Sequence, residues 1–125
     1  MASGAATGLR LYGVIDDELV GEEFLAAQKL LLVRCNDLAA VVAPAPYVTA
    51  TPTDDDVEDY LRVLDALSAN GPVVPAPPGT IFGGEDVVSR WLDVHYGKLH
   101  EALATIDQRD DGRPPYEYVR MELSH

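Results

Sequence analysis

The amino-acid sequence predicts an α+β fold of the ferredoxin-like kind, a two-layer sandwich in which two helices cover one face of a four- to five-stranded, mostly antiparallel sheet. Two observations carry this prediction. Short segments with the apolar patterns of strands lie near both ends and in the middle of the chain, and two longer segments each carry one apolar stripe at helical spacing. The chain has 125 residues, of which 47% are hydrophobic, which suffices for one domain with a buried core.

The domain organisation follows from the same patterns. Residues 1–8 are small and uncharged and lack both the basic and the apolar parts of a secretory signal, and we expect them to be disordered. We expect residues 9–123 to form a single ferredoxin-like domain. A lone cysteine, Cys35, excludes an internal disulfide, so we expect a cytoplasmic protein in which Cys35 is a small buried side chain.

The first strand is predicted over residues 9–15, where apolar side chains fall on both faces. The acidic stretch 16–23 predicts either a loop or a short helical turn. Residues 29–35 and 38–43 then predict two strands, because both are apolar runs of strand length.

A tight hairpin turn is predicted between these two strands. Asn36 and Asp37 are the non-glycine residues that best tolerate the positive φ of a two-residue turn. Pro44 and Pro46 are expected to end the second strand, because proline cannot donate a hydrogen bond to the ladder.

The first long helix is predicted to begin at Thr51 or Thr53, since either can cap a helix and each has an Asp three positions on. The residues 70–72, Asn-Gly-Pro, end it. Its predicted apolar stripe consists of Val57, Leu61, Leu64 and Leu67.

Residues 73–82 are extended but interrupted by prolines and a glycine, so any strand there must be short, irregular or at a sheet edge. A second helix is predicted from residue 85 to residue 106, with Gly97 weakening its middle. Residues 116–123 alternate apolar and polar side chains and predict a final, half-buried strand. The stripe of the second helix consists of Val88, Leu92, His95, Leu99, Leu103 and Ile106.

The charge of the chain excludes several partners. Nine Lys and Arg residues face 21 Asp and Glu residues, which gives a net charge of -12. Nucleic acids and anionic membranes are bound by clusters of basic side chains, and here the basic residues occur singly. We therefore expect no nucleic-acid partner and no membrane partner.

The sequence contains no recognisable catalytic or metal-binding motif. His95 and His100 lie about 140° apart around a helix axis and cannot chelate one ion together. His95 falls on the apolar stripe and is expected to be a core histidine. The glycines at 79–84 lack the Lys-Ser/Thr of a phosphate-binding loop. We predict no catalytic residue, no cofactor and no metal.

Four strings in the chain resemble the GvpL/GvpF family of gas vesicle proteins. They are Leu-Tyr-Gly-Val at 11–14, Asn-Asp-Leu-Ala-Ala-Val-Val at 36–42, Val-Val-Pro at 73–75 and Gly-Thr-Ile-Phe at 79–82. The resemblance implies a modified ferredoxin-like fold and an accessory or minor structural role in gas vesicles, exerted by contact and not by catalysis. Family members usually carry a second, helix-rich domain, and we expect this chain to be a short form with the amino-terminal ferredoxin-like domain only.

The resemblance implies that the partners are the gas vesicle shell protein and other gas vesicle accessory proteins. Two departures from the family pattern are Pro77-Pro78, where Arg-Phe is usual, and Tyr60, where a His is typical. We expect the partner contact to involve the 75–82 segment and three further aromatic residues, for which a position in the core or at its edge is the alternative. The candidate contact residues are Tyr12, Tyr47, Pro75, Pro77, Pro78, Gly79, Thr80, Phe82 and Trp91.

Two alternative functions are left open by the sequence. The chain can be a stand-alone regulatory or scaffolding domain that keeps the fold without a gas vesicle role. It can also be a small ligand-binding domain or a cofactor-independent monooxygenase, in which case His95 or Tyr60 would line an internal cavity of several hundred Å3.

Overall fold

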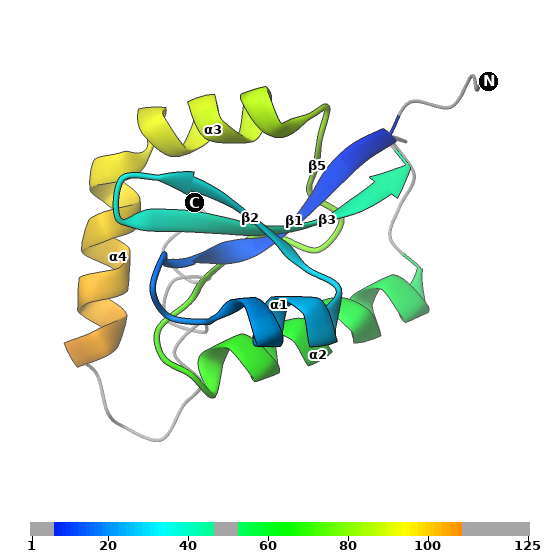
Figure 1. Cartoon of the computed structure of the whole chain (residues 1–125), viewed down its shortest axis with the longest axis horizontal. Helices are drawn as coiled ribbons and strands as arrows, with labels where there is room; N and C mark the ends of the chain where they lie inside the picture. Colours follow the sequence, from blue (N-terminus) through cyan, green and yellow to red (C-terminus); the bar gives the residue numbers. More distant parts are fainter. Residues whose placement is uncertain (1–6, 47–52, 109–125) are drawn as a thin grey trace.

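The computed structural model describes residues 7–46 and 53–108. Figure 1 shows a central sheet with helices on both sides of it. The elements, in chain order, are β1 (Thr7–Asp16), α1 (Glu22–Gln28), β2 (Leu31–Cys35), β3 (Leu38–Pro46), α2 (Asp54–Ser68), β4 (Val74–Pro75), β5 (Ile81–Phe82), α3 (Glu85–Val94) and α4 (Tyr96–Gln108).

The sheet has five strands in the order β2-β3-β1-β4, and β5 also pairs with β1. All of the pairings are antiparallel. The first six elements follow the order βαββαβ, which in this strand arrangement is the ferredoxin-like topology. The predicted α+β class and the mostly antiparallel sheet are therefore confirmed.

The placement of the second long helix differs from the prediction. Ala39 and Val41 of β3 pack in the same core as α2, whereas Ala40 and Val42 pack in a second core with α3 and α4. Because successive side chains of a strand point to opposite faces, α2 and the α3–α4 pair cover opposite faces. Figure 1 shows α1 and α2 below the sheet and α3 above it. The two helices that share one face are α1 and α2.

Helix α1 lies partly in the stretch where a loop or helical turn was expected. Phe24 and Leu25 pack against the α2 core, although no residue of α1 is fully buried. Lys29 ends the helix in the left-handed conformation, with φ of 59°, so β2 begins at Leu31 and not at residue 29. Strand β1 begins at Thr7, two residues before the predicted start.

The predicted hairpin joins β2 and β3, with Cys35 paired to Leu38 and Asn36 at φ of 57°. The second strand does not end at Pro44, as expected, but continues to Pro46. Strand β2 begins opposite Val42, so from Ala43 onward β3 has a paired neighbour only on the β1 side. The Leu11 N–H donates to the Thr80 carbonyl, which lies on the side of β1 away from β3. Since hydrogen-bonded and non-hydrogen-bonded pairs alternate along an antiparallel ladder, Arg10 and Ala43 form a hydrogen-bonded pair and the nitrogen of Pro44 points away from β1. The missing proline N–H therefore breaks no ladder bond.

Helix α2 begins at Thr53, whose side chain accepts a hydrogen bond from the Asp56 N–H while the Asp56 carboxylate accepts one from the Thr53 N–H. This capping box is one of the two predicted helix starts. The apolar stripe is rotated from the prediction, because Leu61 is 39% exposed and Val57 only half-buried. The buried residues are Tyr60, Val63, Leu64 and Leu67.

The 73–82 segment forms two two-residue strands along one side of β1. Ala76 donates its N–H to Tyr12, and Leu11 donates to Thr80, so the segment follows β1 on both sides of an outward turn at 77–79. The prediction of short strands at a sheet edge is confirmed for the part of the sheet that the structure describes.

The predicted second helix is two helices that meet at His95. The His95 backbone, with φ of -102° and ψ of 11°, departs from helical values, and α4 turns away from α3 at this elbow. His95 is exposed, which corrects the prediction of a core histidine. The predicted strand at 116–123 lies outside the described residues.

Candidate functional site

A cleft of about 620 Å3 opens between the β1–β4–β5 side of the sheet and the inner corner of the α3–α4 elbow. The kink at His95 creates this corner, because α3 packs over β2 and β3 while α4 contacts β1 and β4. The lining residues are Leu11, Gly13, Val14, Val74, Pro75, Ala76, Pro77, Thr80, Phe82, Trp91, His95, Lys98, Leu99, Glu101, Ala102 and Thr105.

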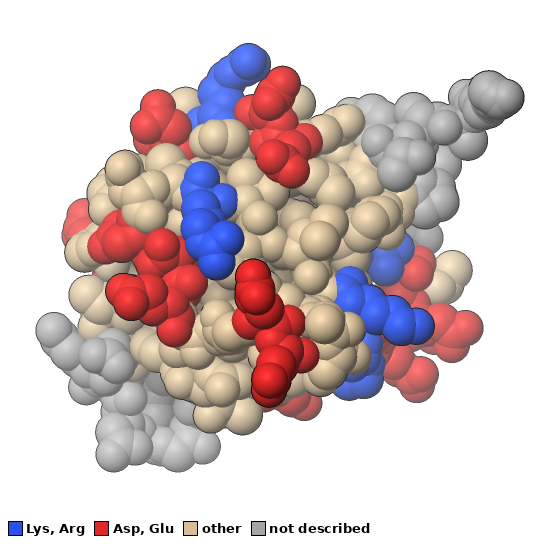
Figure 2. Space-filling model, in the orientation of Figure 1, with Lys and Arg blue, Asp and Glu red and all other residues tan. Residues whose placement is uncertain are grey.

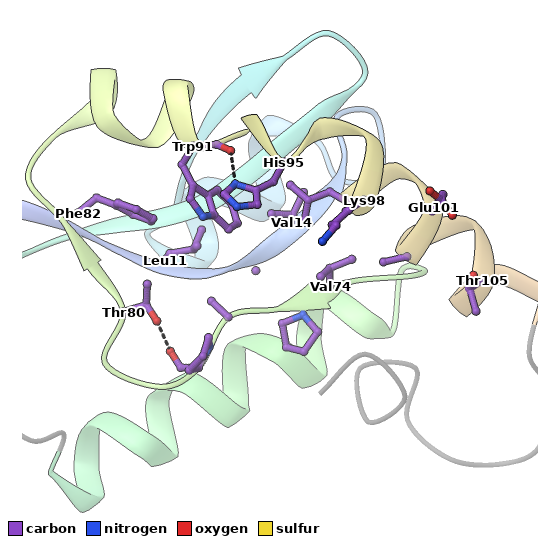
Figure 3. A pocket seen from close by; sticks show the side chains of 16 residues that line it. Leu11, Val14, Val74, Thr80, Phe82, Trp91, His95, Lys98, Glu101 and Thr105 are labelled. Carbon is purple, nitrogen blue, oxygen red and sulfur yellow. Dashed lines mark hydrogen bonds between the residues drawn. The ribbon is translucent and has the colours of Figure 1, made fainter. Parts of the chain in front are cut away.

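The cleft has an apolar floor and an aromatic wall. Leu11, Val14 and Val74 form the floor and are almost fully buried. Phe82 and Trp91 are half-buried, with ring centroids 5.7 Å apart, and the ring of His95 lies 5.3 Å from that of Trp91. Figure 3 shows these three rings along one side of the cleft. Such a lining suits a large apolar group.

Two polar side chains of the cleft, Thr80 and His95, contact the backbone. Thr80 Oγ1 donates a 2.7 Å hydrogen bond to the carbonyl of Pro77 and so closes the 77–79 turn. His95 Nδ1 lies 2.9 Å from the Trp91 carbonyl, which also accepts the His95 backbone N–H. This arrangement offers no nucleophile with a neighbouring base among the cleft residues, and it is suited to binding.

The structure brings five of the predicted contact residues together in the cleft: Pro75, Pro77, Thr80, Phe82 and Trp91. Pro78 and Gly79 are exposed in the adjoining turn, where Gly79 has φ of 84°. Tyr12 is elsewhere. It is 4% exposed and packs in the α2 core on the opposite face of the sheet. Tyr47 lies outside the described residues.

Tyr12 belongs to a polar network between β1 and α2. Its hydroxyl donates to Asp59, which also receives a 2.7 Å hydrogen bond from Arg62. Burial and the Asp59 carboxylate raise the pKa of Tyr12 to about 12. Burial alone would raise the pKa of Asp59, but the hydrogen bonds from Tyr12 and Arg62 outweigh it and lower that pKa. Arg10 forms a parallel link to Asp56 at 3.3 Å. Both links join β1 to α2, so the network has a structural role in holding the helix against the sheet.

A second polar contact joins the β2–β3 turn to α4. The Tyr96 hydroxyl donates to one carboxylate oxygen of Asp37, and His100 Nε2 lies 3.3 Å from the other. The hydrogen bond from Tyr96 is the main reason that the pKa of Asp37 is lowered, and it raises the pKa of Tyr96 in return. This contact fixes the start of α4 and therefore one wall of the cleft.

Sequence reasoning missed several cleft residues. Lys98, Glu101 and Thr105 of α4 reach the cleft only because the helix turns at the elbow, which no local pattern signals. In the acidic stretch identified from the sequence, the carboxylates of residues 16–18, Asp-Asp-Glu, lie within 4.8 Å of one another where β1 ends. The Asp16 carboxylate already accepts the Glu18 N–H, as expected for a loop turn.

Cys35 is free and half-buried, not fully buried as predicted.

Charged side chains cover the surface without marking a second site. Figure 2 shows acidic side chains spread over the visible face, with basic side chains beside several of them. Over α3 and α4, the Asp, Glu, Lys and Arg residues whose side chains the structure describes are Glu85, Asp86, Arg90, Asp93, Lys98 and Glu101. None of the described helices is both long and apolar enough to cross a membrane.

The fold and the site together define a ferredoxin-like domain with an apolar cleft on the sheet face opposite α2. The family model described as "Gas vesicle synthesis protein GvpL/GvpF" matches residues 8–111. The chain therefore belongs to the GvpL/GvpF family of gas vesicle synthesis proteins, and its role is related to gas vesicles. Comparisons with curated proteins and with solved structures found no match.

Proposed function

We propose that this protein is a non-enzymatic accessory or minor structural protein that acts in gas vesicle assembly by contact with the shell protein and other gas vesicle proteins. It would work in the cytoplasm, on or near the vesicle. The observation that supports this proposal is an open apolar cleft with two half-buried aromatic side chains, Phe82 and Trp91, in a chain of the gas vesicle synthesis family. Aromatic residues at the edge of a cleft are frequent anchors of protein interfaces.

The proposed contact surface extends from the cleft onto α3. Val87, Trp91 and Val94 follow one another at helical spacing, and Val87 and Val94 are 43% and 70% exposed. The turn at 77–79 borders the cleft on the other side. Together these residues make an apolar centre with charged side chains around it, which is the usual composition of an interface.

Retention of the purified shell protein on the immobilised protein tests this proposal. Trp91→Ala and Phe82→Ala should each weaken retention at least tenfold, because interface anchors cost about 2 kcal/mol or more when truncated. Leu61→Ala is the matched control, since Leu61 is an exposed apolar residue of α2 on the opposite face. Circular dichroism of each variant establishes that it is folded.

Two results would contradict the proposal. One is failure of the wild-type protein to retain the shell protein or any other gas vesicle protein at low salt. The other is equal retention by the wild type and by the folded cleft variants. Flotation of the protein with isolated vesicles provides an independent measurement of its location.

A small ligand-binding domain or monooxygenase is the second candidate, and the volume of the cleft and the position of His95 favour it. Tyr60 argues in the other direction, because its hydroxyl bonds to the Ala76 carbonyl from the α2 face. Oxygen uptake with an added quinol would favour this candidate, and uptake no faster than that of the quinol alone would contradict it. A regulatory or scaffolding role unrelated to gas vesicles is the remaining alternative. It predicts that the wild-type protein binds no gas vesicle protein.

A further inference from the structure

The cleft contains one cationic side chain besides its apolar floor and aromatic wall. Lys98 lies on the first turn of α4 and lines the cleft. Figure 3 shows its side chain directed toward the sheet, on the side of Val74, whereas Glu101 lies farther along the helix. No ion pair joins Lys98 to Glu101 or to any other residue that the structure describes.

This ammonium group restricts what can fill the cleft. Lys98 is exposed at the mouth of the cleft, so an occupant that covers the floor and the aromatic wall lies beside its ammonium group and displaces part of the surrounding water. A cation that loses water without gaining an acceptor is strongly unfavourable, whereas a carboxylate at hydrogen-bond distance compensates for the loss. An occupant that places a carboxylate near Lys98 is therefore favoured over one that is wholly apolar.

The remainder of the lining specifies the apolar part of the occupant. The rings of Phe82, Trp91 and His95 form a continuous wall opposite Leu11 and Val14. The rings are tilted relative to one another by 49° and 38°, so they present both edges and faces to the cleft. An aromatic ring can make offset or edge contacts with such a wall.

Resting on the proposed function, we propose that the protein partner anchors itself in this cleft by an aromatic side chain flanked by a carboxylate that pairs with Lys98. The ring lies between the Phe82–Trp91 wall and the sheet floor. The carboxylate reaches the Lys98 ammonium at the mouth. The anchor is thus an acidic-aromatic element, although the protein itself carries a net charge of -12.

Three small probes with the same ring and chain test the chemistry of the site: 4-phenylbutyrate, 4-phenylbutanol and 4-phenylbutylamine. Trp91 is the only tryptophan of the chain, so its fluorescence reports occupancy directly. The carboxylate should bind about three- to tenfold more tightly than the alcohol, and the amine should bind most weakly.

Lys98→Gln should abolish the difference between the carboxylate and the alcohol while leaving alcohol binding unchanged. Lys29→Gln is the matched control, because Lys29 is the only other lysine of the chain and is exposed at the end of α1. Equal affinities for the three probes in the wild type, or the same order of affinities in Lys98→Gln, would overturn the inference.

Competition links the site to the partner. Phenylbutyrate at saturating concentration should release retained shell protein, and phenylbutylamine at the same concentration should not. Probe binding that leaves retention unaffected would overturn the assignment of the anchor to the partner. Failure of the wild type to retain any vesicle protein would contradict the proposed function instead, so the two failures are distinguishable.

Discussion

The hydroxyl of Tyr12 donates a 2.6 Å hydrogen bond to Oδ2 of Asp59, which joins the central strand β1 to helix α2. Arg62 holds the other carboxylate oxygen and in turn donates to Gln28 of α1. One carboxylate therefore connects three elements of the ferredoxin-like unit. The pKa of Tyr12 is about 12, above its ordinary value of 10.0, because burial and Asp59 favour the protonated form.

Tyr12→Phe is expected to change the pH dependence of stability. In the wild type, the unfolded chain loses the Tyr12 proton near pH 10 while the folded chain keeps it to about pH 12, so stability falls between these values. Tyr12→Phe should lack this component and lower the free energy of unfolding at neutral pH by about 1 kcal/mol. Urea unfolding at neutral and alkaline pH measures both effects. Parallel alkaline losses in the two proteins would contradict the prediction.

The contact between the β2–β3 turn and α4 predicts which of two substitutions changes the pKa of Asp37 more. The hydrogen bond from Tyr96 is the largest single cause that lowers the pKa of Asp37, ahead of its backbone hydrogen bond and of each of the two contributions from His100. Tyr96→Phe should therefore raise the pKa of Asp37 more than His100→Gln does. Stabilisation by this carboxylate is present above its ordinary pKa and is lost as the pH falls through the lowered value. NMR titration of the Asp37 carboxyl measures the order, and a larger shift in His100→Gln would refute it.

Gly13 is expected to be intolerant of a side chain. A Cβ at this position would lie 2.7 Å from the Val74 carbonyl oxygen and 2.9 Å from a Val73 methyl group. The register of β1 against β3 shifts just before it, and β4 passes close on the other side. Gly13→Ala should lower the free energy of unfolding by about 1–3 kcal/mol.

Gly83→Ala is the control for this substitution, because a Cβ there meets nothing within 4 Å. Its stability should remain within about 0.5 kcal/mol of the wild type. Chemical denaturation of the two variants checks the prediction. Equal stabilities would show that β4 moves aside at little cost.

Gly97→Ala should stabilise the protein. Gly97 lies in the first turn of α4, is exposed, and has open space where a Cβ would be. Alanine has the higher helix propensity, so the melting temperature should rise with a gain of about 0.5 kcal/mol in the free energy of unfolding. The affinity for 4-phenylbutyrate should stay the same, since Gly97 does not line the cleft. A loss of stability would mean that α4 requires glycine at this position.

The features that sequence reasoning predicted are those fixed by neighbouring residues. The cap at Thr53 and Asp56 and the turn at Asn36 depend on hydrogen bonds and backbone preferences within a few residues. The edge position of 73–82 follows from the inability of proline to donate. Each of these could be read from the chain without knowing what lies across the sheet.

The features that it missed depend on contacts distant in sequence. Tyr60 and not Leu61 faces the core, because the phase of α2 is set by packing on β1 and by the bond to Ala76. Helix α1 has no fully buried residue, and its apolar pattern is therefore weak. The placement of α3 and α4 on the second face could not be deduced, because either face of an apolar sheet accepts an amphipathic helix.

The candidate site was predicted in part for the same reason. Residues of the 75–82 segment were identified because they are unusual locally, and most of them line the cleft. Lys98 and the floor residues Leu11 and Val14 look ordinary in the sequence and acquire a role only when the elbow at His95 brings α4 over β1. Tyr12 was predicted to be a candidate partner contact, but it is buried and its hydroxyl bonds to Asp59.

The outward turn at 77–79 has a consequence for selectivity. It divides this edge of the sheet into two strands of two residues each, β4 and β5, which are too short to pair with an added strand. A continuous open edge accepts almost any extended chain, because backbone groups are the same in every protein. A partner that meets the cleft instead must fit its rings and its lysine, so the amino-acid identity of the partner decides whether it is accepted.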